Sequence, residues 1–96
     1  MDDLTITRHE TAKGGEYQAR LTGSPHVGRL TWVAQGNVHL ADHTLVPPEL
    51  GGRGIAGKLV EALVADARAR GFRVKPACSY VVAAFAKHPE WADISA

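Results

Sequence analysis

The stretch from Val46 to Val60 constrains the fold of this 96-residue chain more than any other, because it joins a strand, a glycine-rich turn and a helix start. An apolar run ends at two prolines, four glycines follow among residues 51–57, and a helical pattern continues well beyond them. The first amides of a helix lack carbonyl partners and carry partial positive charge, and glycines let a bulky phosphate approach them. Arg53 and Lys58 add formal charge beside this turn. The stretch therefore predicts a cradle for a pyrophosphate group.

Two common phosphate-binding motifs fit this stretch less well. Residues 52–57 match the dinucleotide fingerprint Gly-x-Gly-x-x-Gly, which directly follows its strand and needs an acidic residue about 20 positions later. Here residues 47–50 intervene, and the next strand candidate ends at Lys75. The glycines before Lys58 also have P-loop spacing, but Leu59 replaces the hydroxyl residue that binds magnesium. We therefore expect neither NAD nor ATP, and a flexible connection without a ligand remains the alternative.

The composition is that of an ordinary globular domain. Hydrophobic residues make up 45% and charged residues 22%, and a net charge of +1 argues against a general nucleic-acid binder. No apolar run approaches the roughly 20 residues that span a bilayer, and the acidic start of the chain does not resemble a secretory signal. The single cysteine excludes an internal disulfide, and the scattered histidines lack metal-ligand spacing. We expect one domain over residues 1–96, cytoplasmic, without metal, membrane or nucleic acid.

Alternating apolar and polar residues predict an antiparallel meander of four strands before the glycine-rich turn. These strands are Leu4–Arg8, Glu16–Leu21, His26–Ala34 and Val38–Val46. Gly28 is a candidate for a β-bulge in the third strand. In the fourth strand, uninterrupted alternation places His39, His43 and Leu45 on one face and leaves Asp42 on the other.

The helix that follows the turn is predicted by apolar residues at helical spacing, and Gly71 is a natural C-terminal cap. The crossover to a fifth strand, Phe72–Lys75, favours parallel pairing with the fourth strand. Ser79 can cap a second helix, Tyr80–Lys87, and a C-terminal tail begins at Pro89. The predicted fold class is α/β, or α+β in some schemes, with a mixed sheet of about five strands and two helices.

The residues around the turn resemble those of the GNAT N-acetyltransferases. Residues 51–56 lie on that superfamily's acyl-CoA loop pattern, Gln/Arg-x-x-Gly-x-Gly/Ala. The residues His43-Thr44-x-Val46-Pro47 before the loop and Pro76-x-Cys78 after it are similar to a short, single-domain branch of the superfamily that has a cysteine after the fifth strand. The resemblance covers most of the chain. One departure is Gly51, which stands where the pattern has Gln or Arg.

The resemblance implies an enzyme that uses acetyl-CoA as cosubstrate and transfers the acetyl group to an amine, which the sequence does not identify. In the superfamily, the backbone of Leu45 and Val46 would pair with the pantetheine arm. The residues that would hold the pyrophosphate are Gly52, Arg53, Gly54, Ile55, Ala56, Gly57 and Lys58. The alternative is a non-catalytic module that binds CoA or a partner.

Two residues are candidates for catalysis. Cys78 stands between a strand and a helix start, where the pKa of a thiol can be lowered, but it equally fits a small buried side chain. The resemblance implies an acyl acceptor at this position. His43 has a side chain that titrates near neutral pH and could act as a general base, or it could be an ordinary strand histidine. Whether these two side chains share a face of the sheet depends on any bulge in the strands.

Overall fold

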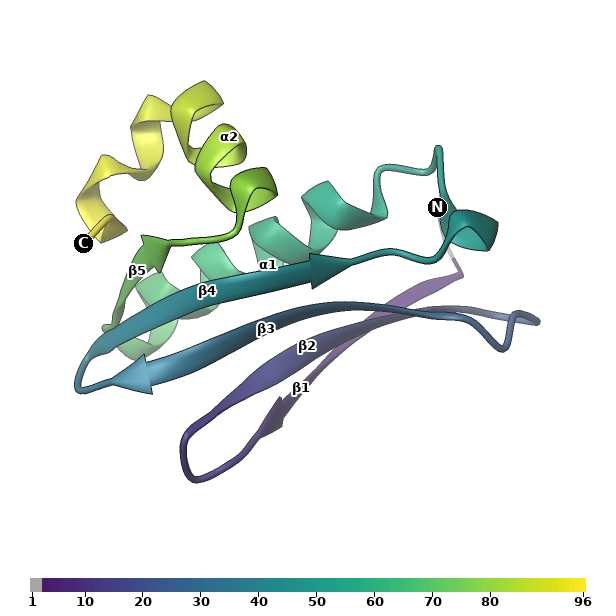
Figure 1. Ribbon diagram of the computed structural model, residues 1–96, viewed down its shortest axis with the longest axis horizontal. Helices are drawn as coiled ribbons and strands as arrows, with labels where there is room; N and C mark the ends of the chain where they lie inside the picture. The colour runs from purple at the N-terminus through teal and green to yellow at the C-terminus, as the bar shows by residue number, and fades with distance from the viewer. Residues whose placement is uncertain (1–2) are drawn as a thin grey trace.

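The computed structural model describes residues 3–96, and its central feature is one mixed five-stranded sheet (Figure 1). The strands lie in the order of the chain: β1 (Leu4–Glu10), β2 (Gly14–Leu21), β3 (Val27–Gln35), β4 (Val38–Leu45) and β5 (Arg73–Pro76). The first four strands pair antiparallel, and β5 pairs parallel with β4. The predicted mixed sheet with a parallel fifth strand is therefore confirmed.

Two α-helices and two 3₁₀ helices complete residues 3–96. They are η1 (Pro48–Leu50), α1 (Ile55–Arg70), α2 (Ser79–Lys87) and η2 (Pro89–Ile94). Helix α1 ends at Gly71, which has φ 80° as expected of a C-terminal cap. The expected cap of α2 is wrong by one residue, because Cys78 holds that position and Ser79 is already helical. The expected C-terminal tail is η2, which buries Trp91 and Ile94.

Both α-helices lie on the same side of the sheet, so the other face carries no helix of the described chain (Figure 1). The buried stripe of α1 packs on β2 and β3, and Val81 of α2 joins the same core. Gly28 lies beneath the first turn of α1, where an added Cβ would be 3.2 Å from Ile55 Cγ2. Gly28 thus allows close helix–sheet packing, and its assignment as a bulge is wrong.

The bulge lies in β4 instead. Thr31 of β3 pairs with His43, but Trp32 pairs with Ala41, which leaves Asp42 as the extra residue. The Thr31 hydroxyl donates a 2.6 Å hydrogen bond to Asp42 Oδ1 on the helix-free face. The extra residue shifts the alternation of the strand from that point on.

The shift in β4 overturns one expectation about its faces. His39 and Ala41 are buried beneath the helices, whereas His43 and Leu45 are exposed, Leu45 by 63%. The prediction that His39, His43 and Leu45 share a face is therefore wrong, because the bulge turns the last part of the strand over.

Candidate functional site

Strand β4 has a free edge where it extends past β5. The two strands pair only from Val38 to Ala41, whereas β4 stays paired with β3 up to Leu45. The amides of Ala77 and Cys78 both donate to the Ala41 carbonyl, at 3.0 and 2.9 Å, and the chain then turns into α2. Beyond Ala41 this edge of β4 faces no other strand within residues 3–96 (Figure 1). Its backbone is thus available to an extended ligand that pairs as a strand does.

The glycine-rich loop that follows β4 presents a run of unpaired amides. Gly52 and Gly54 have φ of 75° and 72°, a left-handed conformation that favours glycine, and Gly54 caps α1. The first helical hydrogen bond runs from Lys58 N to Gly54 O. The six amides from Gly52 to Gly57 donate no hydrogen bond within the described residues. Together with the dipole of α1, they form a cradle for an oxyanion.

Charged side chains around this cradle favour an anion. No acidic residue lies in the first turn of α1. Arg53 is exposed and forms no ion pair with the described carboxylates, whereas Lys58 Nζ lies 3.9 Å from Glu61 Oε1. Gly51 removes one side chain that the superfamily pattern supplies, and an added Cβ there would lie 3.1 Å from Pro48 O. The backbone amides and Arg53 are therefore the main groups that can meet a phosphate.

Cys78 lies beside the free edge of β4, at the N-terminus of α2. Its half-buried Sγ is 3.6 Å from Thr44 Oγ1. Burial alone would raise the pKa of this thiol, but hydrogen bonds from the Thr44 hydroxyl and the amides of Val81 and Tyr80 outweigh it, so the pKa is lowered. A lowered pKa gives more thiolate at neutral pH, which is the nucleophilic form.

The structure brings Thr44, and not His43, next to Cys78. The bulge at Asp42 puts the exposed His43 side chain on the helix-free face, while Thr44 points toward the helices. Leu45 and the half-buried Val46 continue β4 toward the glycine-rich loop. Sequence reasoning missed Thr44 because it assumed uninterrupted alternation in β4. A hydroxyl residue beside the candidate histidine was the available signal.

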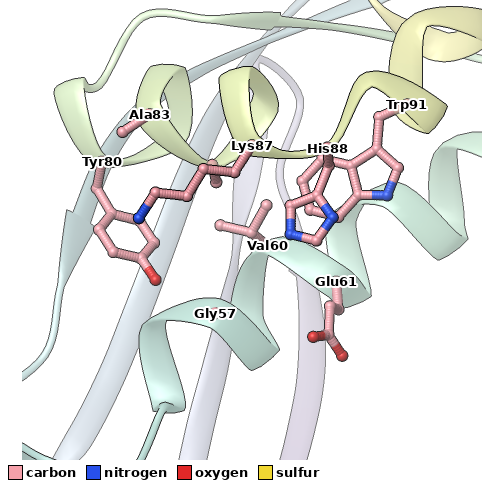
Figure 2. Close-up of a pocket in the computed structure, with 9 residues that line it drawn as sticks. Gly57, Val60, Glu61, Tyr80, Ala83, Lys87, His88 and Trp91 are labelled. Carbon is pink, nitrogen blue, oxygen red and sulfur yellow. The ribbon is translucent and has the colours of Figure 1, made fainter.

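A pocket of about 130 Å³ opens between α1 and α2, next to the glycine-rich loop (Figure 2). It is lined by Gly57, Val60, Glu61, Tyr80, Ala83, Ala84, Lys87, His88 and Trp91. Gly57 belongs both to this pocket and to the cradle, and a methyl group added there would lie 3.6 Å from Tyr80 Oη. The pocket was not foreseen from the sequence, because it depends on how closely the two helices approach.

Metal-ligand groups do not accumulate around these features. Within residues 3–96, no three side chains of His, Cys, Asp or Glu are grouped so that they could hold a metal ion. In the same residues, no helix combines the length and the apolar character that crossing a membrane requires.

Comparison with known proteins assigns the fold to a family. The family model of the GCN5-related N-acetyltransferases matches residues 16–94, and the chain belongs to that family. The chain is also similar, over its full length, to the NMR solution structure of a "GCN5-like putative N-acetyltransferase" from Staphylococcus aureus, with 26% identity, 91% coverage of that chain and a TM-score of 0.74. No curated protein matches the chain. The resemblance and the fold class predicted from the sequence are thereby confirmed.

Proposed function

We propose that the protein transfers the acetyl group of acetyl-CoA to the nitrogen of an amine acceptor. The observation that carries the proposal is the run of six unpaired amides, Gly52 to Gly57, at the end of a strand with a free edge. Membership of the GCN5-related N-acetyltransferase family supports acetyl transfer in general. The arrangement fits a long ligand that has a pyrophosphate at one point and an extended amide-containing arm beside it.

The residues of the cradle and the strand have separate tasks in binding. The pyrophosphate accepts hydrogen bonds from the amides of residues 52–57, and Arg53 and Lys58 supply positive charge. The backbone of Leu45 and Val46 pairs with the amides of the pantetheine arm along the free edge of β4. We infer that the acyl thioester then lies beside this edge, close to the Cys78 sulfur, which is next to Thr44.

The acceptor nitrogen needs a lone pair, so its ammonium form must first lose a proton. His43 is the candidate base, because it is exposed on β4 and a neutral imidazole can accept a proton. In direct transfer, the amine nitrogen bonds to the carbonyl carbon, the carbon–sulfur bond breaks, and the thiolate of CoA leaves with the electron pair. In an alternative two-step mechanism, the Cys78 thiolate makes that attack first and CoA leaves as its thiolate. The amine then displaces the Cys78 sulfur from the acetyl group.

The test combines binding and turnover. We expect calorimetry to detect CoA and acetyl-CoA but neither NAD nor ATP, and mass spectrometry to detect acetylation in a panel of primary amines. Direct transfer predicts near-normal turnover in Cys78→Ala. The two-step mechanism predicts a large loss of turnover in Cys78→Ala and, on the wild-type protein, an acetyl adduct that hydroxylamine removes. His43→Ala should lower turnover while leaving CoA binding unchanged, as expected of a general base. CoA binding without acetylation of any amine would instead favour a CoA-binding module, and binding of NAD or ATP alone would overturn the proposal.

A further inference from the structure

The free edge of β4 is more open toward the helix-free face of the sheet than toward the helices. On the helix side, α2 begins at Cys78, whose half-buried Sγ lies 3.6 Å from Thr44 Oγ1. The start of α2 therefore occupies part of that side. His43 is exposed on the other face, which carries no helix of the described chain (Figure 1). An acceptor amine thus has more room to approach from the helix-free face.

Lys75 brings a positive charge to this face, close to the start of the free edge. Val74 is fully buried in the core beneath the helices, so the alternation of β5 places its neighbours Arg73 and Lys75 on the helix-free face. Lys75 pairs with Leu40, and the pairing of β5 with β4 ends one residue later, at Pro76. Both cations are exposed, and neither forms an ion pair within residues 3–96. The long side chain of Lys75 can therefore extend toward a ligand at the free edge.

Asp42 supplies a negative charge on the same face, beside His43. The Thr31 hydroxyl donates a 2.6 Å hydrogen bond to Asp42 Oδ1, and no group among the described residues donates to Oδ2. Asp42 belongs to the bulge that follows the pair of Leu40 and Lys75, so it lies diagonally across the sheet from Lys75. Diagonal neighbours on one face are within reach of long side chains. In the part of the chain that the structure describes, Asp42 and Lys75 form no ion pair with each other, so both charges are available to a ligand.

From this arrangement, and resting on the proposed function, we propose that the acceptor is a zwitterionic amino acid. Lys75 binds its carboxylate, and Asp42 binds its ammonium group. His43 then takes one proton from the ammonium, and the freed lone pair attacks the acetyl carbon as the thiolate of CoA leaves. Lys75 and Arg73 repel a polyamine, and an amine without a carboxylate leaves Lys75 unpaired. Lys75 is thus a specificity-determining residue for the acceptor.

The test measures acetylation of a panel of L-amino acids, each paired with its amide, which has no negative charge. Release of CoA gives kcat and KM for each acceptor. The wild-type protein should have a higher kcat/KM for an amino acid than for its amide. Lys75→Met should raise KM for the amino acid about tenfold, as expected for one charge-assisted hydrogen bond, and should leave kcat unchanged. The kinetics with the amide should not change in this variant.

Two further variants separate the charges. Lys13→Met is the matched control, because it removes an exposed lysine from the turn between β1 and β2, three strands from β5, and it should keep the wild-type preference. Asp42→Asn keeps an oxygen that accepts the hydrogen bond of Thr31 but removes the negative charge. It should raise KM for the amino acid and for its amide by similar factors, because both acceptors have the ammonium group.

The outcomes distinguish this inference from the proposed function. Amides acetylated as well as their amino acids by the wild-type protein, or acetylation of only amines that have no carboxylate, would overturn the inference and leave acetyl transfer intact. An unchanged KM for the amino acid in Lys75→Met would overturn the role of Lys75. Stoichiometric acetylation of Lys75 itself, located by peptide mass spectrometry, would do the same, since an acetylated lysine has no charge for a carboxylate. Absence of acetylation of every amine would overturn the proposed function as well.

Discussion

At the scale of single residues, Gly54 has a left-handed backbone and faces open space beside the cradle, and glycine suits both conditions. Its φ of 72° is strained for other residues, and an added Cβ would meet no protein atom within 4 Å, so it would point into space open to a ligand. A side chain at this position therefore costs little in packing. It would instead lie in the space that the oxyanion needs.

We predict that Gly54→Asp abolishes CoA binding, because it adds bulk and negative charge at the cradle. The free energy of unfolding should fall by only about 1–2 kcal/mol, the cost of a left-handed conformation in a residue other than glycine. Binding is measured by calorimetry and stability by urea unfolding.

Gly23→Asp is the matched control for this variant. Gly23 has φ 83° and no atom within 4 Å of an added Cβ, but it lies in the turn between β2 and β3. It should lose similar stability and keep normal CoA affinity. Normal CoA binding by Gly54→Asp would show that the pyrophosphate does not occupy the amide cradle.

At the scale of elements, the strands and the long helix could be predicted because their signals are local. The alternation of β1 to β4 and the apolar stripe of α1 are present in the chain itself, and Gly71 ends α1 through its own backbone preference. The unpaired amides of residues 52–57 were also predictable, because they belong to consecutive residues at a helix start. The bulge at Asp42 was not, since it depends on how β4 pairs with β3.

Parts of the site that join distant elements escaped prediction for the same reason. Thr44 meets Cys78 across 34 positions of the chain, after a bulge that the sequence does not mark. Lys87 and Trp91 line a pocket with Gly57 only because α2 and η2 pack beside α1. Such contacts follow from tertiary packing, which local periodicity does not encode.

The contact between β4 and the N-terminus of α2 leads to a prediction about thiol reactivity. Thr44→Val removes the hydroxyl that stabilises the Cys78 thiolate, so the pKa of the thiol should rise. Alkylation by iodoacetamide, followed against pH by intact mass, should therefore shift to higher pH in the variant.

Thr31→Val serves as the control for Thr44→Val. It removes a β-strand hydroxyl that bonds to Asp42 on the helix-free face, away from Cys78. Its alkylation profile should match that of the wild-type protein. Identical profiles for wild type and Thr44→Val would mean that Thr44 does not tune the thiol.

At the scale of the whole molecule, a column of stacked planar groups crosses the core. The guanidinium of Arg8 lies 4.8 Å above the Trp32 ring, Trp32 stacks on His39, and His39 stacks on Phe72 with ring centroids 3.6 Å apart. Within residues 3–96, His39 Nδ1 is buried without a hydrogen-bond partner. The column joins residues of β1, β3 and β4 to Phe72, the residue before β5.

Burial lowers the pKa of His39, the positive charge of Arg8 lowers it further, and Glu10 and Asp66 offset part of this. The unfolded chain binds the proton at about pH 6.5, and the folded protein binds it only at lower pH. The stability that depends on neutral His39 is therefore complete above about pH 6.5 and is lost as the pH falls through the lower folded pKa. We predict that the free energy of unfolding falls as the pH drops below about 6.5, by at most about 1.4 kcal/mol per pH unit, until the pH reaches the lower pKa of the folded protein.

Urea unfolding of His39→Phe tests this prediction. Phenylalanine can keep the stack between Trp32 and Phe72 but cannot bind a proton. The free energy of unfolding should therefore fall less at acidic pH in His39→Phe than in the wild-type protein. The exposed ion pairs of His26 with Glu49 and His88 with Glu90 are unchanged in it. An equal pH dependence in both proteins would assign the acid sensitivity to other groups.

The extra residue in β4 also determines which changes of chain length this strand tolerates. Ala41 and Thr44 both face the helices, although an uninterrupted strand would place residues three apart on opposite faces. Deletion of one member of the pair Asp42–His43 would close the bulge and leave both residues facing the helices. A deletion elsewhere in β4 would turn one part of the strand over relative to the other. Within β4, this pair is thus the place where the strand can lose one residue and still keep Ala41 and Thr44 on the side of the helices.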